Sequence, residues 1–206
     1  MKTQSTNLSS KECSENKRIL LILLPFWTPL IPPLGISCLK SSLEKEGHSV
    51  KTLDANLDPV LGDTYHKYFG CLKECVDEEK RGNFYNIGQN VLRNHLNAYL
   101  SKGNEEELID LVKILVKKHF FVDIEDKSAS EFNKIITEFY INLEDYLVQV
   151  FEKEKFDVFG ISVYSGTLAA SMFCFEVAKK LSPEIMTVMG GGIFADELAI
   201  NSPNFD

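Results

Sequence analysis

The sequence lacks an uninterrupted apolar segment long enough to cross a membrane. Its longest apolar run, from Ile19 to Trp27, is broken by Pro25 and falls far short of the roughly 20 residues that a spanning helix needs. Residues 1–16 are polar and have no apolar core of the kind found in a signal peptide. We therefore expect no membrane partner, and we interpret residues 1–16 as a disordered tail.

Basic side chains are also scarce. The chain has 22 Lys and Arg residues against 30 Asp and Glu residues, which gives a formal net charge of −8. This balance argues against a large phosphate-binding surface, so nucleic acid is not expected as a partner. The 5 cysteines are an odd number, and without an export signal they favour reduced thiols and a cytoplasmic protein.

What the sequence does contain is an alternation of strand-like and helix-like segments. The continuous apolar run Ile19–Leu24 is typical of a central strand buried on both faces. A helix is predicted over Leu34–Glu46, and Gly47 is a typical helix stop. A second strand is predicted over Ser49–Leu53, and this order of elements requires a right-handed parallel crossover.

The alternation resumes toward the other end of the chain. Strands are predicted over Val158–Val163 and Ile185–Met189, with a helix over Leu168–Leu181 between them. Four such strands predict an α/β fold with a flavodoxin-like or Rossmann-like doubly wound parallel sheet. A fifth strand should begin near Asp206, so we expect a truncated fifth strand and a domain that belongs to a longer protein.

The residues between the second and third strands break this pattern. Segment 59–152 predicts a helical insertion, which leaves residues 17–58 and 153–206 for the α/β domain. The segment carries three apolar stripes at helical spacing, which favour contacts within a core over a binding groove. The stripes comprise Leu92, Leu96, Tyr99 and Leu100; Leu108, Leu111, Val112, Leu115 and Val116; and Phe132, Ile135, Ile136, Phe139, Leu143, Tyr146, Leu147 and Val150.

Three loops would leave the carboxyl ends of the predicted strands, where open parallel sheets bind ligands. Their small hydroxyl residues, glycines and lack of charge favour a large, mostly neutral ligand with amides or one phosphate. Any one of these loops is better explained as an ordinary tight turn, with glycine at positive φ and hydroxyls capping helices, whereas three at one edge favour a ligand. The candidate binding residues are Pro25, Trp27, Pro33, Leu34 and Gly35 in the first loop, Ser162, Ser165, Gly166 and Thr167 in the second, and Gly190, Gly191 and Gly192 in the third.

Motifs that would identify a dinucleotide-binding, metal-binding or catalytic site are weak in this sequence. The run Gly190–Ala195 matches G-x-G-x-x-A, but no strand with an acidic end follows it, which favours a chance match. Cys71 and Cys75 are one helical turn apart but lack the further ligands of a tetrahedral site, so no metal site is predicted. None of the 4 histidines falls in an exit loop and no Ser-His-Asp or Cys-His arrangement is visible, so no catalytic residue is assigned.

The strands and their loops carry motifs in a distinctive order. They are the proline-rich segment Pro25–Gly35, then Gly47–Val50 and Leu53–Asn56, and later Phe156–Ser162, Ser165–Thr167 and Val188–Gly191. In this order they resemble the N-terminal cobalamin (vitamin B12)-binding domain of radical S-adenosylmethionine proteins. The resemblance covers residues 17–58 and 155–195 and leaves the helical insertion outside it.

The resemblance implies a cobalamin-binding module that works with a downstream radical S-adenosylmethionine domain in the same polypeptide. That domain would hold a [4Fe–4S] cluster and S-adenosylmethionine through a CxxxCxxC motif, which this chain lacks. The chain alone would therefore not be an enzyme. The full-length protein would carry out methyl transfer or another radical modification, and in some members of the family the substrate is a peptide.

One departure from related cobalamin proteins lies in the loop after the first strand, which has no DxHxxG motif. Cobalamin would then bind without that histidine ligand. The resemblance places Trp27 and Pro25–Pro33 near the corrin face, and it places Ser162, Ser165–Thr167 and Gly190–Gly192 around the nucleotide tail.

Two alternative readings remain. The first is a degenerate domain of the same origin that acts as a scaffold or substrate-docking module without cofactor. The second is a different flavodoxin-like protein, which is disfavoured because the acids of a phosphorelay receiver and the hydroxyl-rich loop of a flavin mononucleotide protein are missing.

Overall fold

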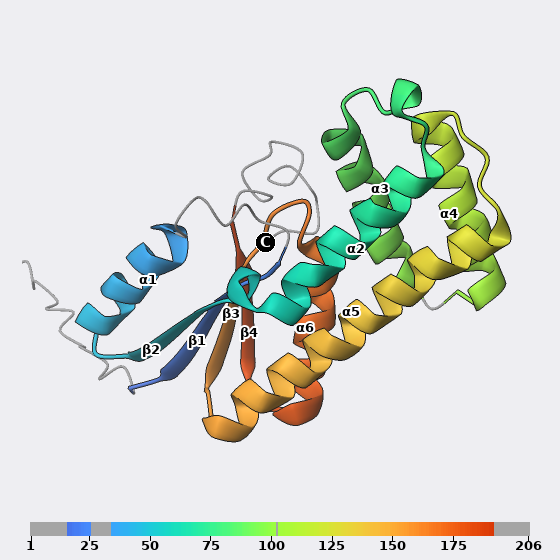
Figure 1. Cartoon of the computed structure of the whole chain (residues 1–206). Helices are drawn as coiled ribbons and strands as arrows, with labels where there is room; N and C mark the ends of the chain where they lie inside the picture. Colours follow the sequence, from blue (N-terminus) through green and yellow to red (C-terminus); the bar gives the residue numbers. More distant parts are fainter. Residues whose placement is uncertain (1–15, 26–33, 102, 192–206) are drawn as a thin grey trace, which may run out of the picture.

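The computed structural model describes residues 16–25, 34–101 and 103–191. Four parallel strands form one sheet in the order β2-β1-β3-β4, with helices on both faces, which is a flavodoxin-like, doubly wound α/β fold (Figure 1). The strands are β1 (Arg18–Leu23), β2 (Ser49–Asp54), β3 (Val158–Ser162) and β4 (Met186–Gly190). The helices are α1 (Leu34–Lys45), α2 (Pro59–Cys75), α3 (Phe84–Leu100), α4 (Glu105–Phe120), α5 (Asp126–Lys153) and α6 (Leu168–Leu181), with short 3₁₀ turns η1 (Ala55–Leu57) and η2 (Glu78–Lys80). The predicted fifth strand and residues 1–15 of the predicted tail lie outside the described residues.

Strand β1 lies in the interior of the sheet, between β2 and β3, as its apolar run predicts. Successive side chains point to opposite faces, so Leu20 and Ile22 join the core beneath α5 and α6, whereas Leu21 and Leu23 join the smaller core beneath α1. Because both faces of β1 are buried, polar side chains would be costly at nearly every position of this strand.

The end of α1 follows from a single glycine. Gly47 has φ +93°, a conformation that glycine adopts without steric penalty. The backbone N–H of Gly47 donates to Glu44 at 3.1 Å, and that of His48 donates to Leu43 at 3.1 Å. This pair of hydrogen bonds is a Schellman motif, which satisfies carbonyls at the helix end. The predicted helix stop is therefore confirmed.

Four helices, α2 to α5, lie between β2 and β3. The 28-residue helix α5 runs from the far end of this insertion back to the sheet (Figure 1). Its Phe151 packs edge-on against Phe159 of β3 with ring centroids 5.7 Å apart, and the buried side chains of insertion and sheet form one continuous cluster. The helical stripes supply core contacts, as predicted: the buried members are Leu92, Leu96, Val112, Leu115, Val116, Phe132, Ile135, Ile136, Phe139, Leu143 and Leu147.

Polar groups are also buried inside the insertion. Tyr68 Oη lies 3.1 Å from His95 Nδ1, and His95 Nε2 lies 2.7 Å from Asn133 Oδ1. All three side chains are buried. Burial lowers the pKa of His95 to about 4, although the hydrogen bond to Asn133 opposes the shift. The fold therefore holds this imidazole neutral.

We expect the insertion to lose stability in mild acid. The pKa of His95 is 6.5 in the unfolded chain and about 4 in the fold. The stability that the neutral imidazole contributes is therefore fully present above pH 6.5 and is lost as the pH falls toward 4. Between pH 7 and pH 5 this linkage lowers the free energy of unfolding by about 2 kcal/mol. Urea unfolding of the wild type and of His95→Gln at pH 7 and pH 5 measures this change in the free energy of unfolding.

His95→Gln should be less stable than the wild type at pH 7. Its free energy of unfolding should also fall by less between pH 7 and pH 5. His66 is exposed on α2, so His66→Gln should keep the wild-type drop. An equal drop in His95→Gln and the wild type would contradict the assignment.

Candidate functional site

The parallel arrangement brings the predicted binding loops to one edge of the sheet. Leu23, the last residue of β1, pairs with Ser162 of β3, and Ser162 pairs with Gly190 of β4. Pro25 follows β1 and is buried, and Gly191 follows β4. Strands β1 and β3 flank the point where the strand order reverses, which is where open sheets of this kind bind ligands.

Other predicted residues of this edge are less informative. Trp27, Pro33 and Gly192 lie outside the described residues. Leu34 and Gly35 begin α1, and Leu34 is 68% exposed, so it contributes little to the core and is accessible from solvent.

A pocket of about 300 Å³ lies where the loop between β3 and α6 meets the helical insertion. It includes Ser165, Gly166 and Thr167 of the predicted set, but not Ser162 or Gly190. The remaining lining residues are Tyr65 from α2, Gln89, Asn90, Leu92, Arg93 and Leu96 from α3, and Tyr164 from the loop. The pocket is thus built jointly by the sheet edge and the insertion.

The hydroxyl of Thr167 is used to hold this loop in shape. Its Oγ1 accepts a hydrogen bond from the backbone N–H of Tyr164 at 3.0 Å and donates to the Tyr164 carbonyl at 3.2 Å. The Thr167 carbonyl in turn accepts from Ser171 Oγ at 2.7 Å. Thr167 therefore positions the loop, whereas the exposed Ser165 and the open space beside Gly166 are what the loop offers to a ligand.

The glycines at the end of β4 and directly after it differ in what their backbone requires. The backbone N–H of Val163 donates to Gly190 at 2.6 Å, which brings the two chain segments together. Gly191 has φ +126°, and a Cβ there would lie 2.5 Å from the Val163 carbonyl oxygen. Gly191 thus permits a backbone contact within the protein, whereas a Cβ at Gly190 would meet no atom of the described residues within 4 Å.

The helical side of the pocket was not predicted from the sequence. Gln89, Asn90 and Arg93 recur at spacings of one and three residues on α3, beside the buried Leu92 and Leu96. A helical projection of this stretch shows a polar edge next to the apolar stripe. It does not show that this edge meets the loop after β3, because that depends on how α5 returns the chain to the sheet.

The described residues offer few other reactive or metal-binding groups. Cys71 and Cys75 are half-buried on α2, and burial raises the pKa of both thiols. No three His, Cys, Asp or Glu side chains gather into a potential metal site within the described ranges. Nor does any helix in those ranges have the length and apolarity to cross a membrane.

Comparison with known proteins assigns no family to the chain. No protein-family profile, curated protein or solved structure matches it. The resemblance to cobalamin-binding domains therefore stays a prediction, and the argument for function rests on the pocket and its position in the fold.

Gly190 at the end of β4 and Gly191 just beyond it should respond differently to the same substitution. We expect Gly191→Ala to lower the free energy of unfolding by about 2 kcal/mol or more, because it combines positive φ with a steric clash. Gly190→Ala should change it by at most about 0.5 kcal/mol, because its Cβ enters open space. Urea unfolding of both variants measures the difference, and equal effects would disprove the role assigned to Gly191.

Proposed function

We propose that this chain is a cobalamin-binding module that receives its ligand at the carboxyl edge of the sheet. The observation that carries the proposal is the pocket of about 300 Å³ beside the β3–α6 loop, next to the position where the strand order reverses. Three residues of the nucleotide-tail motif, Ser165, Gly166 and Thr167, line it.

The size of the pocket suits one part of the ligand. Pockets for small molecules span about 300–1,000 Å³, so this pocket admits a nucleotide-sized tail and not a whole corrin. The corrin would lie outside it, over the sheet edge near Pro25. No histidine lines the pocket, so these residues would hold cobalamin by contacts to its periphery and not through an imidazole–cobalt bond.

Catalysis belongs, in this proposal, to a radical S-adenosylmethionine domain downstream in the same polypeptide. That domain would supply the [4Fe–4S] cluster and S-adenosylmethionine for methyl transfer or another radical modification, with a peptide as one class of substrate. The role of the present chain is to bind and orient cobalamin. A cytoplasmic location is part of the same proposal, because the iron–sulfur cluster and the free thiols both require reducing conditions.

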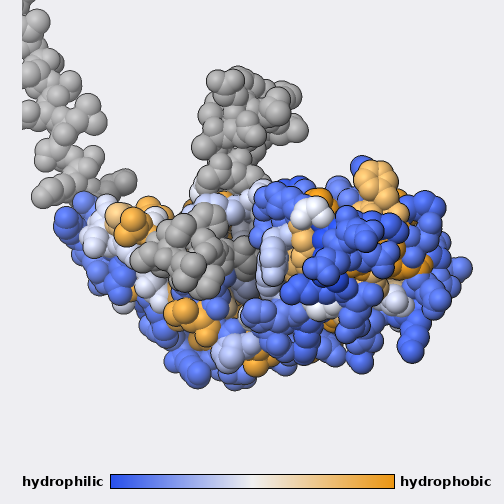
Figure 2. Space-filling view, turned by 45° about the horizontal axis from the view of Figure 1, so that its top comes forward, coloured by the Kyte–Doolittle hydropathy of each residue, from blue (hydrophilic) through white to orange (hydrophobic). Residues whose placement is uncertain are grey.

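A second candidate function is a scaffold or substrate-docking module that has lost its cofactor. It is favoured by apolar side chains on the outer surface of the insertion, which is otherwise largely hydrophilic in the view of Figure 2. Ile114 on α4 is 60% exposed, and Phe121, just beyond α4, is 85% exposed with φ 58°. A bulky residue rarely adopts that conformation, and an exposed aromatic side chain is a frequent anchor of protein interfaces.

Cobalamin binding can be tested by titrating the purified protein with hydroxocobalamin and measuring visible absorption after desalting. We expect about one retained cobalamin per chain and a shifted spectrum. Gly166→Val should weaken binding about tenfold or more, because its side chain enters the pocket. It should leave the free energy of unfolding within about 0.5 kcal/mol of the wild type, since no atom of the described residues lies within 4 Å of a Cβ at this position.

Gly70→Val is the matched control, because Gly70 on α2 also has open space beside it and does not line the pocket. It should bind like the wild type. Lack of retention by the wild type would favour the cofactor-free scaffold, and unchanged binding by Gly166→Val would show that the ligand lies elsewhere.

A further inference from the structure

Helix α3 presents a positive charge to the pocket. Arg93 is half-buried and lines the cavity together with Gln89 and Asn90. Its Nη2 donates to Asn90 Oδ1 at 3.1 Å, which fixes the guanidinium with a neutral partner. Within the described segments, none of the lining residues is an Asp or Glu, and Arg93 forms no ion pair.

This arrangement contrasts with Arg18 at the opposite edge of the sheet. Arg18 Nη2 lies 3.0 Å from Asp157 Oδ1, and its Nε also donates to that carboxylate. The charge of Arg18 is thus compensated within the protein, whereas the charge of Arg93 faces a cavity. In a chain of net charge −8, an uncompensated arginine at a pocket wall is a feature that an anionic ligand group would satisfy.

The other polar groups around Arg93 suit the oxygens of a phosphate. Gln89 and Ser165 can each donate a hydrogen bond, and Gly166 leaves its backbone open to close approach. The half-buried ring of Tyr65 lines the same cavity and offers a surface for a base or ring attached to that phosphate. A single cation with neutral donors matches one phosphate ester better than a polyphosphate.

We infer that this pocket binds the phosphate ester of a nucleotide-like group, with Arg93 of the helical insertion as its charged contact. The inference deepens the proposed function, because it makes the insertion part of the cobalamin site and assigns the phosphodiester of the nucleotide tail to Arg93. It differs from the resemblance, which leaves the insertion outside the binding domain.

The test uses two fragments that differ only in the phosphate: α-ribazole 3′-phosphate and α-ribazole. Calorimetric titration of the wild type should show tighter binding of the phosphorylated fragment. Arg93→Gln should weaken that binding about tenfold or more, since a charged hydrogen-bonded contact is lost, and should leave α-ribazole unaffected. Arg93→Lys should restore part of the loss, because it keeps the charge without the planar fork.

Lys118→Gln is the control for charge, because Lys118 is exposed on α4 and does not line this pocket. It should bind both fragments like the wild type, and urea unfolding should show that all variants remain folded. A loss in Lys118→Gln equal to that in Arg93→Gln would overturn the inference, since it would show an effect of net charge alone.

The outcomes separate this inference from the proposed function. Phosphate-dependent binding that requires Arg93 supports the inference even if hydroxocobalamin is not retained, in which case cobalamin is the wrong ligand. Retained hydroxocobalamin with the same affinity in Arg93→Gln overturns the inference and leaves the proposed function standing. Failure of the wild type to distinguish the two fragments also overturns it.

Discussion

The burial of β1 on both faces is the constraint on which the rest of the structure depends. A strand with apolar side chains on both sides must be covered from both sides. Helix α1 therefore lies on one face, while α5 and α6 lie on the other. The crossovers that place these helices make the strands parallel, and parallel strands deliver all their exit loops to one edge. The candidate site lies at that edge because of how the core is covered.

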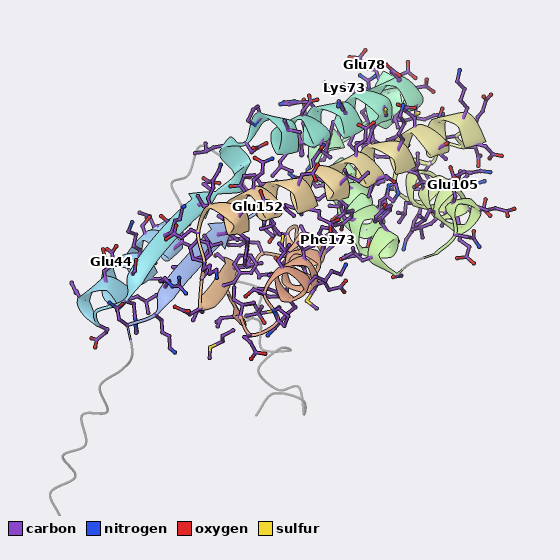
Figure 3. All side chains as sticks on the ribbon, turned by 90° about the horizontal axis from the view of Figure 1, so that it is seen from below. Glu44, Lys73, Glu78, Glu105, Glu152 and Phe173 are labelled. Atoms are coloured by element: carbon purple, nitrogen blue, oxygen red, sulfur yellow. The ribbon has the colours of Figure 1, made fainter. Side chains whose placement is uncertain are left out.

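Helix α5 extends this constraint to the insertion. Its last turns pack on the sheet through Phe151 and Phe159. Its middle contacts α6, where Tyr140 meets Phe173 with ring centroids 4.8 Å apart; Figure 3 labels Phe173 on α6. Burying a phenylalanine side chain contributes about 1.5–3 kcal/mol, so several such contacts hold the helix firmly against the sheet. The position of α3 relative to the β3–α6 loop follows from this shared core, and the pocket between them is a consequence of it.

The sequence predicted the layers of the fold better than it predicted the walls of the site. Local signals were sufficient for β1, whose apolar run is uninterrupted, and for the end of α1, which Gly47 determines by its own conformation. The loop after β3 was also found, because strand ends meet at one edge in any parallel sheet. Arg93 was missed, because its importance comes from a contact between segments far apart in the chain. The role of Thr167 inside its own loop was likewise invisible, since a hydroxyl can serve a turn or a ligand equally well.

An acidic chain can bind an anion when the favourable charge is closer than the unfavourable ones. Most carboxylates belong to the outer surface, and Glu44, Glu78 and Glu105 project from well-separated parts of the molecule (Figure 3). At physiological ionic strength, exposed charges are screened beyond about 8 Å, so exposed carboxylates farther than this from the pocket repel an anion there only weakly. Arg93 would act at hydrogen-bonding distance in a half-buried position, where screening is less effective. The net charge would then govern how slowly an anionic ligand approaches, whereas the local arrangement of Arg93, Gln89 and Ser165 would govern how tightly it is held.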